Sequence, residues 1–105
     1  MVRILLVCNA GMSTSLLVTA MVKAAKAKEI DLEIQASPLI SAESEMLKWD
    51  IAMLGPQVRH CYANLVKKTE GKVPIEIIDM KDYGLMRGEN VLNTALEKIE
   101  EFKNK

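Results

Sequence analysis

ILLVCNAGMSTS, residues 4–15, is the stretch that decides the fold of this chain. Four apolar residues predict a buried strand that ends at Cys8, small and hydroxyl residues predict a tight loop, and a helical pattern begins near Met12. Loop amides and a helix N-terminus attract negative charge, so this arrangement predicts an anion site beside a thiol. The same setting stabilises a thiolate, the nucleophilic form of cysteine. Cys8 is therefore the candidate nucleophile, expected to attack or carry a phosphoryl group.

The rest of the chain repeats the order of strand and then helix. Strands are expected at 2–8, 31–36, 51–54 and 75–78, and helices at 12–28, 41–48, 56–68 and towards the end of the chain, with a loop at 79–84. Such alternation is typical of a parallel sheet with helices on both faces. We therefore expect a single domain over residues 1–105, with a three-layer α/β/α architecture.

The burial pattern of the strands predicts their order. Strands 2–8 and 51–54 are continuously apolar, as central strands should be, whereas 31–36 and 75–78 include polar residues and fit the edges. With right-handed crossovers, the predicted order is 2-1-3-4. The chain direction then reverses between the first and third strands, where open α/β sheets bind their ligands. The loop after Cys8 and the turn at 55–57 are expected to meet there.

Composition narrows the class of function. The 14 basic and 14 acidic residues balance, and aromatic residues are few, which argues against nucleic-acid binding. No apolar run approaches the roughly 20 residues of a membrane span. Two cysteines do not make a disulfide framework, so free thiols and a cytoplasmic location are expected. No spacing of Cys, His and carboxylates predicts a metal site, and no cofactor is expected.

The residues after Cys8 allow two interpretations. Ser13, Thr14 and Ser15 can simply cap a helix, or they can also donate hydrogen bonds to phosphate oxygens. Gly11 can serve a tight turn or a close approach of the backbone to an anion. The second cysteine, Cys61, falls on an apolar helix face and is expected to pack in the core.

Residues 8–17, CNAGMSTSLL, resemble the phosphocysteine loop of enzyme IIB of the sugar phosphotransferase system, of the lactose, cellobiose and chitobiose type. The segment 54–58, LGPQV, is similar to the stretch that follows the third strand in that family, and 79–84, DMKDYG, to the loop after its fourth strand. Length and element order agree along nearly the whole chain. The resemblance implies a flavodoxin-like fold, which the small tyrosine phosphatases share.

The resemblance also implies an activity and partners. A member of that family is a phosphotransferase whose cysteine, here Cys8, accepts a phosphoryl group from a phosphohistidine of enzyme IIA. It passes the group to a disaccharide bound by the membrane enzyme IIC, through which alone the protein meets the membrane. The residues expected to bind the phosphoryl group are Asn9, Ala10, Gly11, Met12, Ser13, Thr14 and Ser15. Met12, Gln57 and Tyr83 are expected to rim the site and dock both partners.

Two other classes of protein share this kind of fold. A small cysteine-dependent phosphatase or an arsenate reductase is the main alternative, but the phosphatase signature requires Arg six residues after the cysteine, where Thr14 stands. No Asp-Pro dipeptide offers the usual acid of those phosphatases. A non-enzymatic receiver or binding module would carry acidic residues after the first and third strands, where this chain has Cys8 and Leu54-Gly55.

Overall fold

The computed structural model describes the backbone of residues 1–8 and 12–104 and the side chains of residues 1–8 and 15–104. Four parallel strands form one sheet, β1 (Val2–Cys8), β2 (Leu32–Pro38), β3 (Ile51–Leu54) and β4 (Ile75–Ile77). The sheet has the order β2-β1-β3-β4, which confirms the predicted topology.

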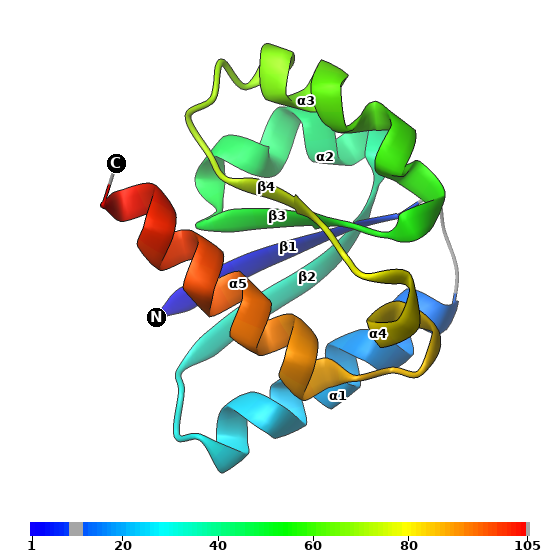
Figure 1. The fold of residues 1–105 in the computed structure, drawn as a ribbon, viewed down its shortest axis with the longest axis vertical. Coiled ribbons are helices and arrows are strands. Elements are labelled where there is room, and N and C mark those ends of the chain that lie inside the picture. The colour runs from blue at the N-terminus through cyan, green and yellow to red at the C-terminus, as the bar shows by residue number, and fades with distance from the viewer. Residues whose placement is uncertain (9–11, 105) are drawn as a thin grey trace.

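Helices cover both faces of this sheet (Figure 1). α1 (Met12–Ala27) and α5 (Gly88–Lys103) lie on one face together with the short α4 (Met80–Gly84). α2 (Leu39–Glu45) and α3 (Tyr62–Lys68) lie on the other, each next to a 3-10 turn, η1 (Met46–Lys48) or η2 (Pro56–Cys61). The expected three layers are therefore present.

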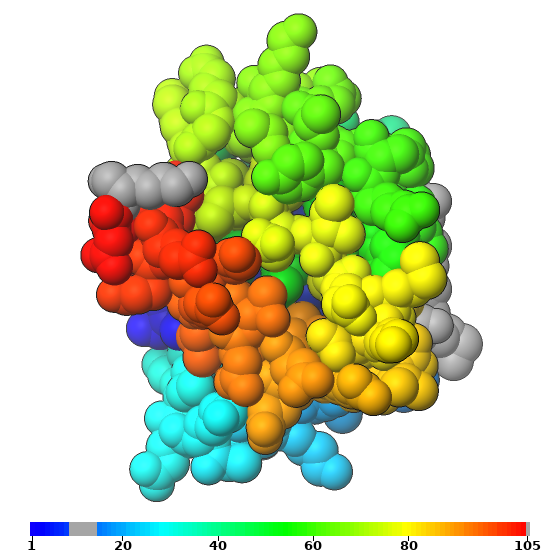
Figure 2. All heavy atoms as spheres, in the orientation of Figure 1, coloured from blue at the N-terminus to red at the C-terminus, as the bar shows by residue number. Residues whose placement is uncertain are grey.

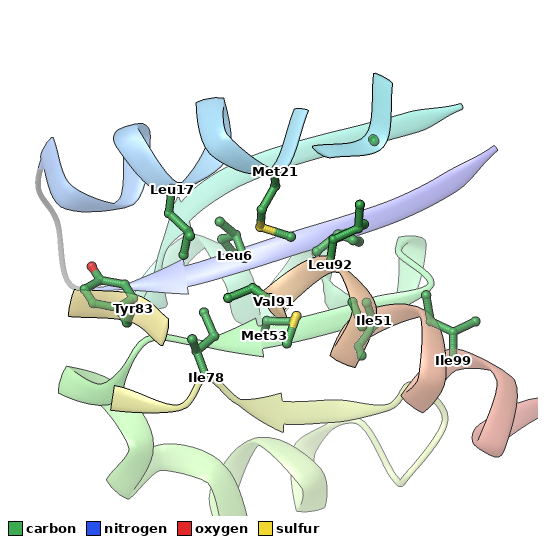
Figure 3. Packing of buried hydrophobic residues seen from close by; sticks show 13 residues of the cluster. Leu6, Leu17, Met21, Ile51, Met53, Ile78, Tyr83, Val91, Leu92 and Ile99 are labelled. Carbon is green, nitrogen blue, oxygen red and sulfur yellow. The ribbon is translucent and has the colours of Figure 1, made fainter. Parts of the chain in front are cut away.

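The alternation of side chains along β1 divides the core into two clusters. Ile4 and Leu6 point to the face of α1 and α5, where the fully buried Leu17 and Leu92 pack against them. Leu5 and Val7 point to the opposite face. Figure 3 shows the first cluster between α1, α5 and the sheet. A strand buried on both faces needs a continuous apolar sequence, which is why β1 was evident from the sequence.

β2 covers the strand expected at about 31–36 and runs two residues further, to Pro38, which lies opposite Cys8. Proline is tolerated there because β2 is an edge strand. The helix that follows begins at Leu39 rather than after Ser41, and Ser41 lies inside it, where its carbonyl accepts a hydrogen bond from the Ser44 hydroxyl.

The segment 79–84 is a helix rather than the expected loop. Asp79 caps it, since its carboxylate accepts hydrogen bonds from the backbone N–H groups of Lys81 at 2.9 Å and Asp82 at 3.2 Å. An N-cap of this kind satisfies amides that have no partner within the helix. The helix places Tyr83 on its inner side, where the ring joins the first core cluster.

Two large side chains that the helical spacing of apolar residues would place on a buried face are exposed. Leu16 on α1 is 58 % exposed, and Tyr62 at the start of α3 is 40 % exposed. Leu17 and Leu65, their neighbours on the same helices, take the buried positions. An apolar stripe wider than the contact with the sheet leaves its outer members in solvent.

Candidate functional site

Cys8 is the last residue of the central strand β1. It lies opposite Pro38 of β2, and the preceding Val7 lies between Ser37 of β2 and Leu54 of β3. From β1 the chain crosses to β2 on one side of the strand, and from β2 it crosses back over β1 to β3 on the other side. Cys8 therefore stands at the point where the strand order reverses. The switch point predicted from the sequence is thus where the structure places the thiol.

The Cys8 side chain is buried, with 5 % of its surface exposed. By the alternation of β1 it belongs to the face that α1 and α5 cover. β2 and β3 flank its strand on both sides. These neighbours leave the carboxyl end of the sheet as the direction from which a reactant can approach the sulfur.

α1 begins at Met12, four residues after Cys8, and continues for 16 residues. The N-terminus of a helix of this length carries partial positive charge and backbone N–H groups without helical partners. The first turn of α1 contains no acidic residue, and the sequence between Cys8 and Lys23 contains no charge of either sign. Backbone dipoles and neutral donors are therefore what this segment offers to an anion.

The predicted phosphate-binding residues fall largely outside the described part of the chain. Asn9, Ala10 and Gly11 lie outside the described backbone, and the side chains of Met12, Ser13 and Thr14 lie outside the described side chains. Met12 begins α1, and Ser15 is exposed in its first turn. The roles of all seven residues remain predictions.

Gln57 and Tyr83, predicted on the rim, are in direct contact. The Gln57 side-chain amide Nε2 donates a hydrogen bond to the Tyr83 hydroxyl at 3.2 Å. Gln57 is exposed on η2, after β3, whereas Tyr83 on α4, after β4, is only 8 % exposed. The sequence placed both residues in this region but contained no sign that they bind each other.

Gly55 links these two residues to the end of β1. Its N–H donates to the Val7 carbonyl at 2.8 Å. A β-carbon at this position would lie 3.6 Å from Cε2 of Tyr83 and 2.6 Å from Oε1 of Gln57. A side chain at Gly55 would thus displace the Gln57 carboxamide, whereas the Tyr83 ring lies at ordinary contact distance from this position beside Cys8.

Exposed apolar side chains also lie on segments that follow the carboxyl ends of three strands. Ile40 follows β2 and is 86 % exposed, Met80 follows β4 and is 62 % exposed, and Leu16 lies in α1 after Cys8. Isolated exposed apolar residues are common, but three on segments that follow β2, β1 and β4 make this end of the sheet a candidate contact surface. Sequence analysis missed Ile40 and Met80, and their position directly after predicted strands was the available signal.

The second cysteine, Cys61, lies away from the Cys8 site. Cys61 ends η2 and is partly buried against the cluster on the α2 and α3 face, as predicted.

No group of three or more His, Cys, Asp or Glu in the described residues is arranged to hold a metal ion. Among the described helices, none has both the length and the apolarity needed to cross a membrane.

A groove lies on the side of the molecule where β4 forms the sheet edge. Figure 2 shows β4 at the surface between α3 and α5. Apolar walls of this groove come from Tyr62, Val66 and Phe102, and Val73 and Pro74 before β4 also line it. The groove thus opens towards the amino end of the sheet, away from Cys8.

The chain matches a known family along most of its length. Residues 3–94 match the family described as "PTS system, Lactose/Cellobiose specific IIB subunit". The galactose-specific EIIB component of Lactococcus lactis subsp. cremoris (strain MG1363) is 44% identical over 98 residues, 88% of this chain and 91% of that protein. The oligo-beta-mannoside-specific EIIB component of Bacillus subtilis (strain 168) is 38% identical over 97 residues, 91% of this chain and 94% of that protein.

Solved structures show the same fold. The cellobiose-specific IIB component of Borrelia burgdorferi has a TM-score of 0.79 and 42% identity, and the match covers 95% of this chain and 93% of that one. The lactose-specific IIB domain of Streptococcus pneumoniae has a TM-score of 0.82, with 92% and 96% coverage. Its 20% identity shows likeness of fold alone.

Proposed function

Since the chain belongs to the lactose/cellobiose-specific IIB family of the sugar phosphotransferase system, we propose that Cys8 is its covalent phosphoryl carrier. Cys8 takes the phosphoryl group from a phosphohistidine of enzyme IIA and passes it to a sugar held by the membrane enzyme IIC. The protein acts from the cytoplasm, and its sugar is a disaccharide of the cellobiose, lactose or chitobiose class.

The position of Cys8 carries this proposal. A thiol at the end of a central strand, at the switch point of the sheet and four residues before the N-terminus of α1, stands where α/β proteins bind anions. The other cysteine, Cys61, packs against the opposite face of the sheet. One of the two thiols therefore has the surroundings that a nucleophile needs.

Two displacements at phosphorus make up the reaction. The Cys8 thiolate attacks the phosphorus, an S–P bond forms, and the P–N bond breaks with its electron pair on the donor imidazole. A hydroxyl of the sugar later attacks the same phosphorus and releases its proton to solvent, and the S–P bond breaks to return the thiolate. Residues 9–15 supply amides and hydroxyls to the charge that develops on the phosphoryl oxygens.

An uncharged loop suits a carrier better than a phosphatase. A cation beside the phosphoryl group would bind it strongly, whereas neutral donors hold it and still release it to the next acceptor. Thr14 stands where a phosphatase of this fold needs Arg. The phosphocysteine of this protein is therefore expected to outlast a phosphatase intermediate and to await the sugar.

The partners dock on the carboxyl end of the sheet. Met12 and Gln57 are the proposed contacts there, and Tyr83 contributes through its small exposed part. The exposed Leu16, Ile40 and Met80 extend this surface with apolar area. IIA and IIC use the surface in turn, because each must bring its reacting atom to the same sulfur.

Reconstitution tests this proposal. The protein is combined with phosphorylated IIA, membranes that contain IIC, and labelled cellobiose, and the formation of sugar phosphate is measured. Wild type and Cys61→Ser should support it, and Cys8→Ser should not. Equal sugar phosphorylation with Cys8→Ser would show that another residue carries the group.

A further inference from the structure

The hydrogen bond between Gln57 and Tyr83 joins two segments that follow different strands. Gln57 belongs to η2, after β3, and Tyr83 to α4, after β4. The amide Nε2 of Gln57 donates and the Tyr83 oxygen accepts, at 3.2 Å. Because the oxygen accepts from Gln57, the hydrogen of the hydroxyl is not used in this bond.

The pair lies against the backbone that supports Cys8. Gly55 donates to the carbonyl of Val7, the residue before Cys8, and its open side is in contact range of both the Tyr83 ring and the Gln57 carboxamide. In Figure 3 the Tyr83 hydroxyl lies at the carboxyl end of β1. The hydroxyl is thus at the same end of the sheet as the thiol.

Packing alone does not account for the hydroxyl of Tyr83. Its ring is buried in the first core cluster with Ile78 and Leu17, a task that phenylalanine would perform as well. Burial also fixes the ring, so the oxygen is held in one place without further loss of side-chain entropy. A rigid ring with an oriented hydroxyl is suited to hydrogen bonding at the reaction site.

We propose that Tyr83 donates a hydrogen bond to the phosphoryl group on Cys8, and that Gln57 is the positioning residue that orients this hydroxyl. The inference rests on the proposed function of Cys8. The segment from Cys8 to Lys23 has no charged residue before Lys23 and offers the phosphoryl oxygens neutral donors, and a charged oxygen is a strong acceptor for a hydroxyl. The transfer step needs no proton from Tyr83, because the electron pair of the broken P–N bond stays on the donor imidazole.

Tyr83→Phe removes the hydroxyl and preserves the ring, and Tyr62→Phe on α3 is its matched control. Both variants are phosphorylated with IIA under single-turnover conditions over a range of IIA concentrations. For Tyr83→Phe we expect a transfer rate at saturating IIA that is lower by about 10- to 100-fold, the usual effect of a hydrogen bond to a charged group. The concentration of IIA that gives half the maximal rate should change much less, because only 8 % of Tyr83 is exposed to a docking partner, and Tyr62→Phe should behave as wild type.

The ³¹P chemical shift of the phosphocysteine is a second measurement, separate from the transfer rate, that a purely packing role of Tyr83 would not change. It should shift in Tyr83→Phe and not in Tyr62→Phe. Gln57→Met removes the orienting amide from an exposed position, so the fold is preserved; a smaller rate loss and a shift of the same sign are expected.

Each outcome decides the inference. Wild-type rates and unchanged ³¹P resonances in Tyr83→Phe and Gln57→Met would overturn it while leaving Cys8 as the carrier. If the half-saturating IIA concentration rises while the maximal rate and the ³¹P resonance stay unchanged, the pair serves docking alone and the inference is overturned. If the wild-type protein forms no phosphocysteine at all, the failure belongs to the proposed function.

Discussion

Gly88 on α5 lies in backbone contact with Ala20 on α1. A β-carbon at position 88 would lie 2.4 Å from the carbonyl carbon of Ala20 and 2.7 Å from its Cβ. No side chain fits at such distances, so this glycine sets how closely the two helices approach. The same helices bury Leu17 and Leu92 against the sheet, and α1 is the helix that follows the Cys8 loop.

Gly88→Ala should therefore destabilise the protein, because backbone rather than a flexible side chain has to move. We expect a loss of about 1–3 kcal/mol in the free energy of unfolding, typical of overpacking, measured by urea denaturation. Gly84→Ala is the control: its β-carbon would meet nothing within 4 Å, so we expect no loss and up to about 1 kcal/mol of gain. Equal stability of the two variants would contradict the close contact.

Asp79 determines whether α4 forms, and α4 carries Tyr83. Asp79→Ala removes the acceptor for the amides of Lys81 and Asp82 and should cost about 0.5–2 kcal/mol of stability. Asp79→Asn retains a capping oxygen and should retain most of that stability. Thermal unfolding of the two variants measures the difference, and identical losses would show that the cap contributes nothing.

Two equally exposed leucines test the docking surface. Leu16 and Leu47 are both 58 % exposed, but Leu16 follows Cys8 on α1 whereas Leu47 lies in η1, before β3 at the amino end of the sheet. Leu16→Ser should raise the dissociation constant for IIA by about tenfold, the value of one buried apolar side chain, and Leu47→Ser should leave it unchanged. Titration calorimetry measures both, and a larger effect of Leu47→Ser would move the surface to the opposite end.

The absence of a phosphatase arginine predicts a slow reaction with small phosphate esters. The chain has Thr14 where that arginine would stand, and the segment after Cys8 offers only neutral donors. Incubation with p-nitrophenyl phosphate should therefore release no more nitrophenol than incubation with Cys8→Ser. Rapid turnover that depends on Cys8 would support the phosphatase alternative.

Much of this fold was predictable because its signals are local. The continuous apolar run of β1 and the alternation in β2 gave the strands and their order, and the residues after Cys8 pointed to the candidate site. These features depend on which residues stand side by side in the sequence. A family resemblance then added partners that no pattern of residues supplies.

The features that were missed depend on contacts between distant segments. The bond between Gln57 and Tyr83 spans 26 positions, and no periodicity encodes it. Leu16 fits an apolar stripe as well as Leu17 does, and only the width of the contact with the sheet decides which one is buried. The helix at Met80–Gly84 is so short that its sequence reads equally well as a loop, although Asp79 was a visible capping signal.

The carrier role of Cys8 is tested most directly by intact-mass analysis after incubation with phosphorylated IIA. We expect wild type and Cys61→Ser to gain the mass of one phosphoryl group, and Cys8→Ser, with an unfolding midpoint close to that of wild type, to gain none. A phosphoryl group that is retained in Cys8→Ser, or lost in a normally folded Cys61→Ser, would contradict the account.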